Sequence, residues 1–196
     1  DILNVLLPSK ITSEDIVIVS IDETSFAAFE TQWPWPRELH GMLIERLVEE
    51  GARDIIFDVV FAEPSEVESD AYFVEAISAA KNVILASDLT AVDDGFMTGV
   101  IETRPYIEFE DAGARVGLAG VDQDNDRVIR YFPSFKNTLS SVAAGIDDVP
   151  EERSKIINYI GEDHSFDYIS YYQFFIEDGI EEGAIENKYV LIGLDV

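Results

Sequence analysis

Two carboxylates, a guanidinium and two indoles are spaced so that one edge of a parallel sheet would hold them all. Asp22 and Asp58 each follow a short apolar run, and Trp33, Trp35 and Arg37 lie between the two runs. Carboxyl ends of parallel strands and N-termini of crossover helices share one edge, so we expect these side chains to meet there. Indole walls and a charged floor suit a planar or cationic ligand. The sequence thus predicts a ligand-binding site at these five residues.

The same residues also support a purely structural interpretation. In it, Asp22 caps backbone amides of the turn and Asp58 pairs with Arg37, while Trp33 and Trp35 pack their loop against the sheet. Both interpretations stand as hypotheses.

A second carboxylate cluster, Asp122, Asp124 and Asp126, lies in a predicted turn. An EF-hand loop starting at Asp122 would need Gly at its sixth position and Glu at its twelfth. Those positions hold Arg127 and Pro133, so the EF-hand is excluded. The three carboxylates are a candidate for a looser cation site within the turn.

Catalytic patterns are scarce. The chain has no cysteine, which removes thiol nucleophiles, disulfides and thiolate metal sites. Its two histidines, His40 and His164, lie beside polar residues and are expected on the surface. No pattern indicates a cofactor, and we expect this chain not to be an enzyme. The catalytic alternative is an acidic metal-assisted hydrolase that uses Asp22 and Asp58.

The elements that must position these residues alternate between strand and helix. Apolar runs predict buried strands over residues 16–21, 55–57, 83–86 and 189–192. Apolar residues at three- and four-residue steps predict helices over residues 37–50 and 70–80. Gly51 suits the left-handed position after the first of these helices. Strand, helix and strand in this order indicate βαβ units with parallel strands.

The predicted fold is α/β: one domain with a mixed, partly parallel sheet built from βαβ units plus an antiparallel hairpin, with helices packed on the sheet. Segments 115–119 and 128–132 flank the acidic turn and are expected to form that hairpin, and a helix is expected over 168–175. Residues 1–13 lack a clear period and are expected to be a lead-in segment before a single domain over 14–196.

The charge balance excludes several partners. With 40 Asp and Glu against 13 Lys and Arg, the formal net charge is -27. Proteins that bind nucleic acids obtain much of their affinity from Lys and Arg on phosphates, so a nucleic-acid partner is excluded. Docking on anionic lipid through a basic face is excluded for the same reason.

Several stretches together resemble one known family, the CHASE domain of the second type, and the resemblance covers nearly the whole chain. The fairly specific run Trp33-Pro34-Trp35-Pro36-Arg37 carries much of this likeness. The supporting segments are 18–25, 51–61, 122–130 and 190–193.

The resemblance implies an extracytoplasmic sensory domain of a bacterial receptor, periplasmic or extracellular. Such a domain is tethered to the membrane by flanking helices, so residues 1–13 would lead in from a preceding membrane helix. It would bind an unidentified small-molecule or periplasmic ligand and regulate a cytoplasmic cyclase or kinase. A protein-interaction or dimerisation module, forming a homodimer, is a further hypothesis.

Overall fold

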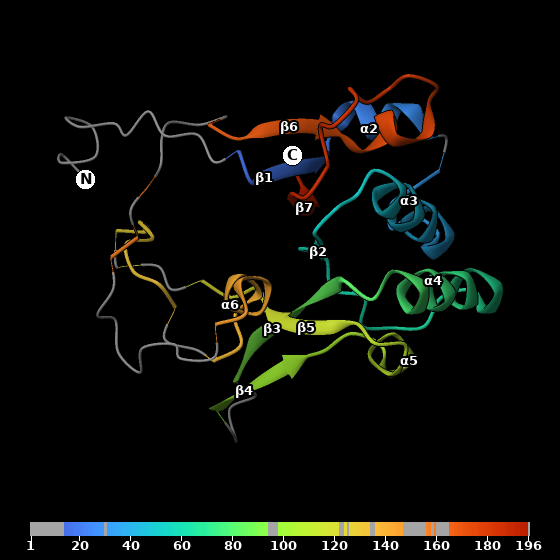
Figure 1. The fold of residues 1–196 in the computed structure, drawn as a ribbon. Helices are drawn as coiled ribbons and strands as arrows, with labels where there is room; N and C mark the ends of the chain where they lie inside the picture. Colours follow the sequence, from blue (N-terminus) through green and yellow to red (C-terminus); the bar gives the residue numbers. More distant parts are fainter. Residues whose placement is uncertain are drawn as a thin grey trace.

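The computed structural model describes residues 14–29, 31–93, 98–121, 124, 126–133, 136–146, 156–157, 159 and 165–195. They form a seven-stranded mixed sheet with helices packed on it, which confirms the predicted α/β class (Figure 1). Its strands are β1 (Ile16–Ile21), β2 (Asp54–Phe57), β3 (Val83–Asp93), β4 (Thr98–Thr103), β5 (Arg115–Leu118), β6 (Asp167–Ser170) and β7 (Tyr189–Leu194).

The strand order is β4-β3-β2-β7-β1-β6, and β5 pairs with β3 beside this path. All neighbouring pairs are parallel except β3 and β4, which are antiparallel. The four strands predicted from apolar runs are all present, although β3 continues well beyond the predicted segment. The last of them, β7, pairs with both β1 and β2 and therefore lies between them.

The helices are α2 (Glu23–Ala28), α3 (Arg37–Glu49), α4 (Val67–Ala80), α5 (Ile107–Asp111), α6 (Leu139–Ala144) and the 3₁₀-helix η1 (Tyr171–Phe175). Helices α3 and α4 pack side by side, while α6 contacts β5 and β3 (Figure 1). Gly51 follows α3 with φ of 79°, which confirms its predicted left-handed conformation.

The core is divided by the sheet because successive strand residues point to opposite faces. Ile55 and Phe57 of β2 belong to the larger cluster, which α3, α4, α5 and η1 cover. Ile56 belongs to a smaller cluster on the other face, where Leu139 of α6 packs. The sheet thus carries a thick aromatic layer on one face and a lighter cover on the other.

Two predicted elements are wrong. The expected hairpin of 115–119 with 128–132 does not form: β5 pairs in parallel with β3, and Tyr131 bridges to Ile156. The antiparallel hairpin is β3–β4 instead. Because α5 carries the chain back between β4 and β5, β5 runs in the direction of β3.

The helix expected over 168–175 is a strand in its first part. Residues Asp167–Ser170 form β6, which pairs with β1, and the 3₁₀-helix starts only at Tyr171. Ser170 and Gln173 form a capping box at this change of direction, in which Gln173 accepts a hydrogen bond from the Ser170 amide.

Candidate functional site

The predicted convergence of Asp22 and Asp58 at one sheet edge is confirmed in its geometry. Both β1 and β2 run parallel to β7, so the residues that follow them leave at the same edge. The insertion of β7 separates the two aspartates by one strand. Asp58 donates its backbone amide to the Ile192 carbonyl at 2.8 Å, which fixes its backbone beside β7.

Asp22 is the N-cap of α2. Its Oδ1 accepts a hydrogen bond from the Ser25 amide at 2.8 Å, and its Oδ2 accepts one from the Ser170 hydroxyl. Partial burial alone would raise the pKa of Asp22, but the hydrogen bonds from Ser170, Ser25 and Thr24 outweigh it and lower the pKa to about 2. Both carboxylate oxygens are therefore already engaged by the chain, as the structural interpretation expects.

The two indoles lie in an aromatic cluster. Trp35 is 1% exposed and packs against Phe29 and Tyr171, with ring centroids 4.8 and 5.0 Å away. Trp33 is half-buried and lies edge-on to Trp35 at 5.4 Å. The Trp35 side chain therefore belongs to the core, and only Trp33 presents indole surface at this loop.

Arg37 does not pair with Asp58, so that part of the structural interpretation is wrong. Its ion-pair partner is Asp70 of α4, with Nε 3.9 Å from Oδ1. Its guanidinium also lies 4.5 Å from the centroid of Phe61, and Nη2 donates to the Glu63 carbonyl at 3.3 Å. Desolvation lowers the pKa of Arg37, and Asp70 acts in the opposite direction. Through its ion pair with Asp70, Arg37 therefore connects the Trp33–Arg37 loop to α4.

Asp58 is exposed at the sheet edge, and its side chain has a different environment from that of Asp22. Desolvation and, second, the nearby Asp88 carboxylate raise its pKa. Asp22 and Asp58 thus share an edge, whereas Trp35 belongs to the core and Arg37 pairs with Asp70. The role of the five predicted residues in ligand binding stays a prediction.

His40 is buried, which corrects the expectation of a surface histidine. Its side chain is 0% exposed, and its Nδ1 lies 2.9 Å from the Tyr171 hydroxyl. Desolvation, with a smaller effect from Arg37, lowers the pKa of His40 to about 3, so the imidazole is neutral near pH 7. The sequence did carry a signal: His40 shares the helical stripe of the buried Leu43, Ile44 and Leu47. His164 lies outside the described residues.

The acidic turn contains an internal ion pair. Arg130 Nη1 donates to Asp124 Oδ2 at 2.9 Å, and both of its terminal nitrogens donate to Asp126, at 2.8 and 2.7 Å. These bonds lower the pKa of Asp126 to about 2. Asp122 lies outside the described residues. Within the described part of the chain no group of carboxylates and histidines is placed to hold a metal ion, and the cation site stays a prediction.

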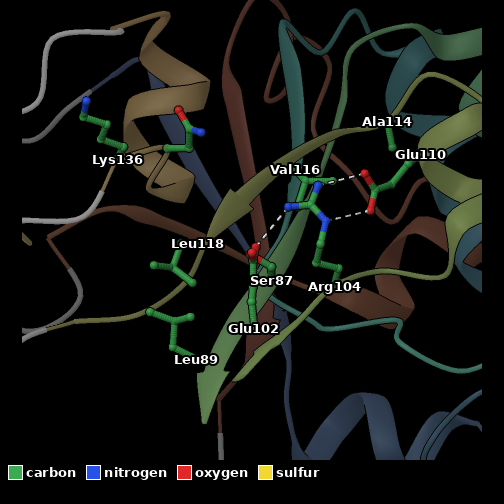
Figure 2. Close-up of a pocket in the computed structure, with 10 residues that line it drawn as sticks. Ser87, Leu89, Glu102, Arg104, Glu110, Ala114, Val116, Leu118 and Lys136 are labelled. Carbon is green, nitrogen blue, oxygen red and sulfur yellow. Dashed lines mark hydrogen bonds and ion pairs between the residues drawn. The ribbon is translucent and has the colours of Figure 1, made fainter. Parts of the chain in front are cut away.

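A cavity of about 270 Å³ lies elsewhere, between β3, β4, α5 and β5 (Figure 2). One wall is charged and is formed by Glu102, Arg104 and Glu110; other lining residues are Ser87, Leu89, Ala114, Val116, Leu118, Lys136 and Asn137. Sequence reasoning missed this cavity because β4 was not predicted. The sequence shows Glu102 and Arg104 at alternate positions, but it does not show which residues they contact in the fold.

The charged wall of the cavity consists of a bidentate ion pair between Arg104 and Glu110, with Glu102 as a second partner of Arg104. Arg104 Nε and Nη2 donate to the two oxygens of Glu110 at 3.1 and 2.8 Å, and Nη1 donates to Glu102 Oε1 at 3.0 Å (Figure 2). These carboxylates, with Glu110 first, raise the pKa of Arg104 and keep it charged. The cavity can therefore hold a small molecule between a charged wall and an apolar one.

Comparisons with known proteins place the chain in a family. The family model described as the CHASE2 domain matches residues 1–196. A search of curated proteins and a search of solved structures found no match.

Of the helices that the structure describes, none has the length and apolar character needed to cross a membrane. CHASE2 domains are extracytoplasmic sensor domains of signalling receptors. Because the match covers every residue, this chain belongs to the CHASE2 family.

Proposed function

We propose that this domain binds a small molecule outside the cytoplasm and regulates a cytoplasmic cyclase or kinase in the same receptor. The match of the whole chain to a family of extracytoplasmic sensors carries this proposal. A receptor of this kind would be tethered to the membrane by helices flanking the domain. The domain itself would be a regulatory module and not an enzyme.

The cavity at β3, β4, α5 and β5 supports the binding part of the proposal. It joins segments that are distant along the chain, from Ser87 in β3 to Asn137 next to α6. A ligand bound there would contact several elements at once. It would shift the receptor between two states if its affinity for the two differed.

The absence of cysteine from the chain allows a direct test of location. Val67 is 84% exposed, so Val67→Cys creates a single accessible thiol in a full-length receptor whose other cysteines are replaced by serine. A membrane-impermeant maleimide should label this thiol in intact cells. Labelling only after lysis would contradict an extracytoplasmic location.

A buried thiol is the control for folding. Ala86 is 0% exposed, so Ala86→Cys should resist the same maleimide both before and after lysis under native conditions. For the regulatory part, cyclase or kinase activity is measured in membranes from the same cells. Activity that is unchanged when the cavity is blocked by Ala114→Trp, in a receptor whose Ala86→Cys thiol still resists the maleimide, would contradict regulation through this cavity.

A further inference from the structure

We propose that the cavity at β3, β4, α5 and β5 binds an α-amino acid with a small aliphatic side chain. This proposal deepens the proposed function and rests on it for its biological meaning, but the binding itself is testable separately. Three features of the cavity support it: the hydrogen-bonding groups left free on the charged wall, the apolar lining residues, and the volume of the cavity.

The charged wall offers both kinds of partner that a zwitterion needs. The guanidinium of Arg104 has five N–H donors, and its bonds to Glu102 and Glu110 use one on each of three nitrogens. Two N–H donors are left for a ligand carboxylate. Glu102 accepts from Arg104 through Oε1, which leaves Oε2 for a ligand ammonium.

The overall charge of the protein also favours a zwitterion over an anion. In the cavity Glu102 and Glu110 are balanced by Arg104 and Lys136, but the whole chain carries -27. A carboxylate without an ammonium would therefore meet repulsion from the general field of the protein. A zwitterion is neutral overall and satisfies both signs.

Away from the three charged side chains the cavity has an apolar part. Figure 2 shows Leu89 and Leu118 beside each other there, whereas Val116 and Ala114 lie next to Arg104 and Glu110; Lys136 and Asn137 also line the cavity. Branched aliphatic groups pack well on such a surface, because burying their methyl and methylene groups removes apolar area from water.

The volume restricts the ligand to a small one. The cavity of about 270 Å³ is slightly smaller than most known ligand pockets, which run from about 300 to 1,000 Å³. A branched-chain amino acid with room for a few waters fits this space, whereas a nucleotide or a disaccharide does not.

The test uses L-leucine and L-valine as probes, with the 196-residue chain in calorimetric titration. Two leucine analogues form the comparison: 3-methylbutylamine lacks the carboxylate, and 4-methylpentanoate lacks the ammonium. We expect leucine or valine to bind and both analogues to bind at least about tenfold more weakly, because each loses one charge-assisted contact.

A matched arginine separates the site from a surface ion pair. Arg46 of α3 also binds two glutamates, Glu49 and Glu50, and is 45% exposed against 48% for Arg104, but it does not line the cavity. Arg104→Gln should weaken the binding of leucine about tenfold or more, whereas Arg46→Gln should leave it unchanged.

Three results would overturn the proposal: no binding of either amino acid at millimolar concentration, an amine analogue that binds as tightly as leucine, or equal effects of the two arginine variants. None of these results bears on the maleimide labelling of Val67→Cys. Failure of the amino-acid site and failure of the extracytoplasmic location are therefore distinguishable.

Discussion

The hydroxyl of Tyr171 lies 2.9 Å from Nδ1 of His40, and both side chains are completely buried. This contact joins η1 to α3 beneath the Trp33–Arg37 loop. Tyr171→Phe removes the hydroxyl and leaves a ring nitrogen without a partner, so we expect a loss of roughly 1–3 kcal/mol in the free energy of unfolding. Denaturant titration measures the loss. The neighbouring Tyr172→Phe is the control and should change stability by less than about 0.5 kcal/mol.

The burial of neutral His40 makes stability depend on pH. The pKa of His40 falls from its ordinary 6.5 to about 3 on folding, so the unfolded chain binds the extra proton between these values. Stability is therefore full above 6.5 and falls as the pH is lowered towards 3, with a slope of up to about 1.4 kcal/mol per pH unit from this group.

The double variant His40→Leu, Tyr171→Phe tests this dependence because it removes the titrating group and its partner together. Unfolding is followed between about pH 7 and pH 5, where a histidine in the unfolded chain gains its proton before most carboxylates do. The double variant should show a shallower slope than the wild type. Equal slopes would contradict a neutral buried His40.

The side-chain cap of α2 should contribute measurably to the free energy of unfolding at neutral pH but not in acid. Asp22→Ala removes the acceptor of the Ser25 amide and of the Ser170 hydroxyl, so we expect a loss of about 1 kcal/mol. Because folding lowers the pKa of Asp22 from 3.8 to about 2, this contribution is present above 3.8 and disappears as the pH falls to 2.

Glu66→Ala is the control for this cap, because Glu66 occupies the N-cap of α4 without a side-chain cap hydrogen bond. It should change the free energy of unfolding by less than about 0.5 kcal/mol. Equal losses for the two variants would mean that the bonds of Asp22 add nothing to stability.

Asp70 should stabilise the Trp33–Arg37 loop through α4. Asp70→Ala removes the carboxylate that accepts the Ser65 amide at 2.6 Å and leaves Arg37, whose side chain is only 12% exposed, without its counter-charge. We expect a loss of roughly 2–3 kcal/mol by thermal or denaturant unfolding. Glu68→Gln, an exposed change on the same helix, should be near neutral. A loss for Asp70→Ala as small as that of Glu68→Gln would contradict this role.

The close contact of β5 with α6 should not tolerate a methyl group. A Cβ at Gly117 would lie 2.6 Å from the Cα of Leu139, which is backbone and cannot rotate away. Gly117→Ala should therefore cost about 1–3 kcal/mol through overpacking. Gly99→Ala in β4 is the control, because a Cβ there meets nothing within 4 Å. Melting temperatures of the two variants compare them directly.

The sequence was sufficient for elements whose own apolar pattern defines them. The run Ile16–Ile21 and the helix Arg37–Glu49 were both predicted within a residue or two. The order of the strands in the sheet could not be predicted in the same way. The apolar run at 189–192 indicates a buried strand but does not indicate its position between β1 and β2. The polar residues near His40 led to the expectation of a surface position, although His40 shares the helical stripe of the buried Leu43, Ile44 and Leu47. The apolar Met42 and Val48 of the same helix lie off this stripe and are exposed.

The candidate site illustrates the same limit. That Asp22 and Asp58 share an edge follows from strand direction alone, and it was predicted. The partners of Arg37 and the charged wall around Arg104 depend on long-range packing, of α4 in one case and of α5 against β4 in the other. No local pattern encodes those contacts.

The pairing of β1 with β7 has a mechanical consequence. The two strands are parallel and in register from Ile16 with Tyr189 to Ile21 with Leu194, so β1 begins and β7 ends at opposite edges of the sheet. Tension applied to those two ends would load the hydrogen bonds of this ladder together, in shear, and not peel them apart one by one. The centre of the sheet is thus a stiff coupling between the point where the chain enters it and the point where the chain leaves.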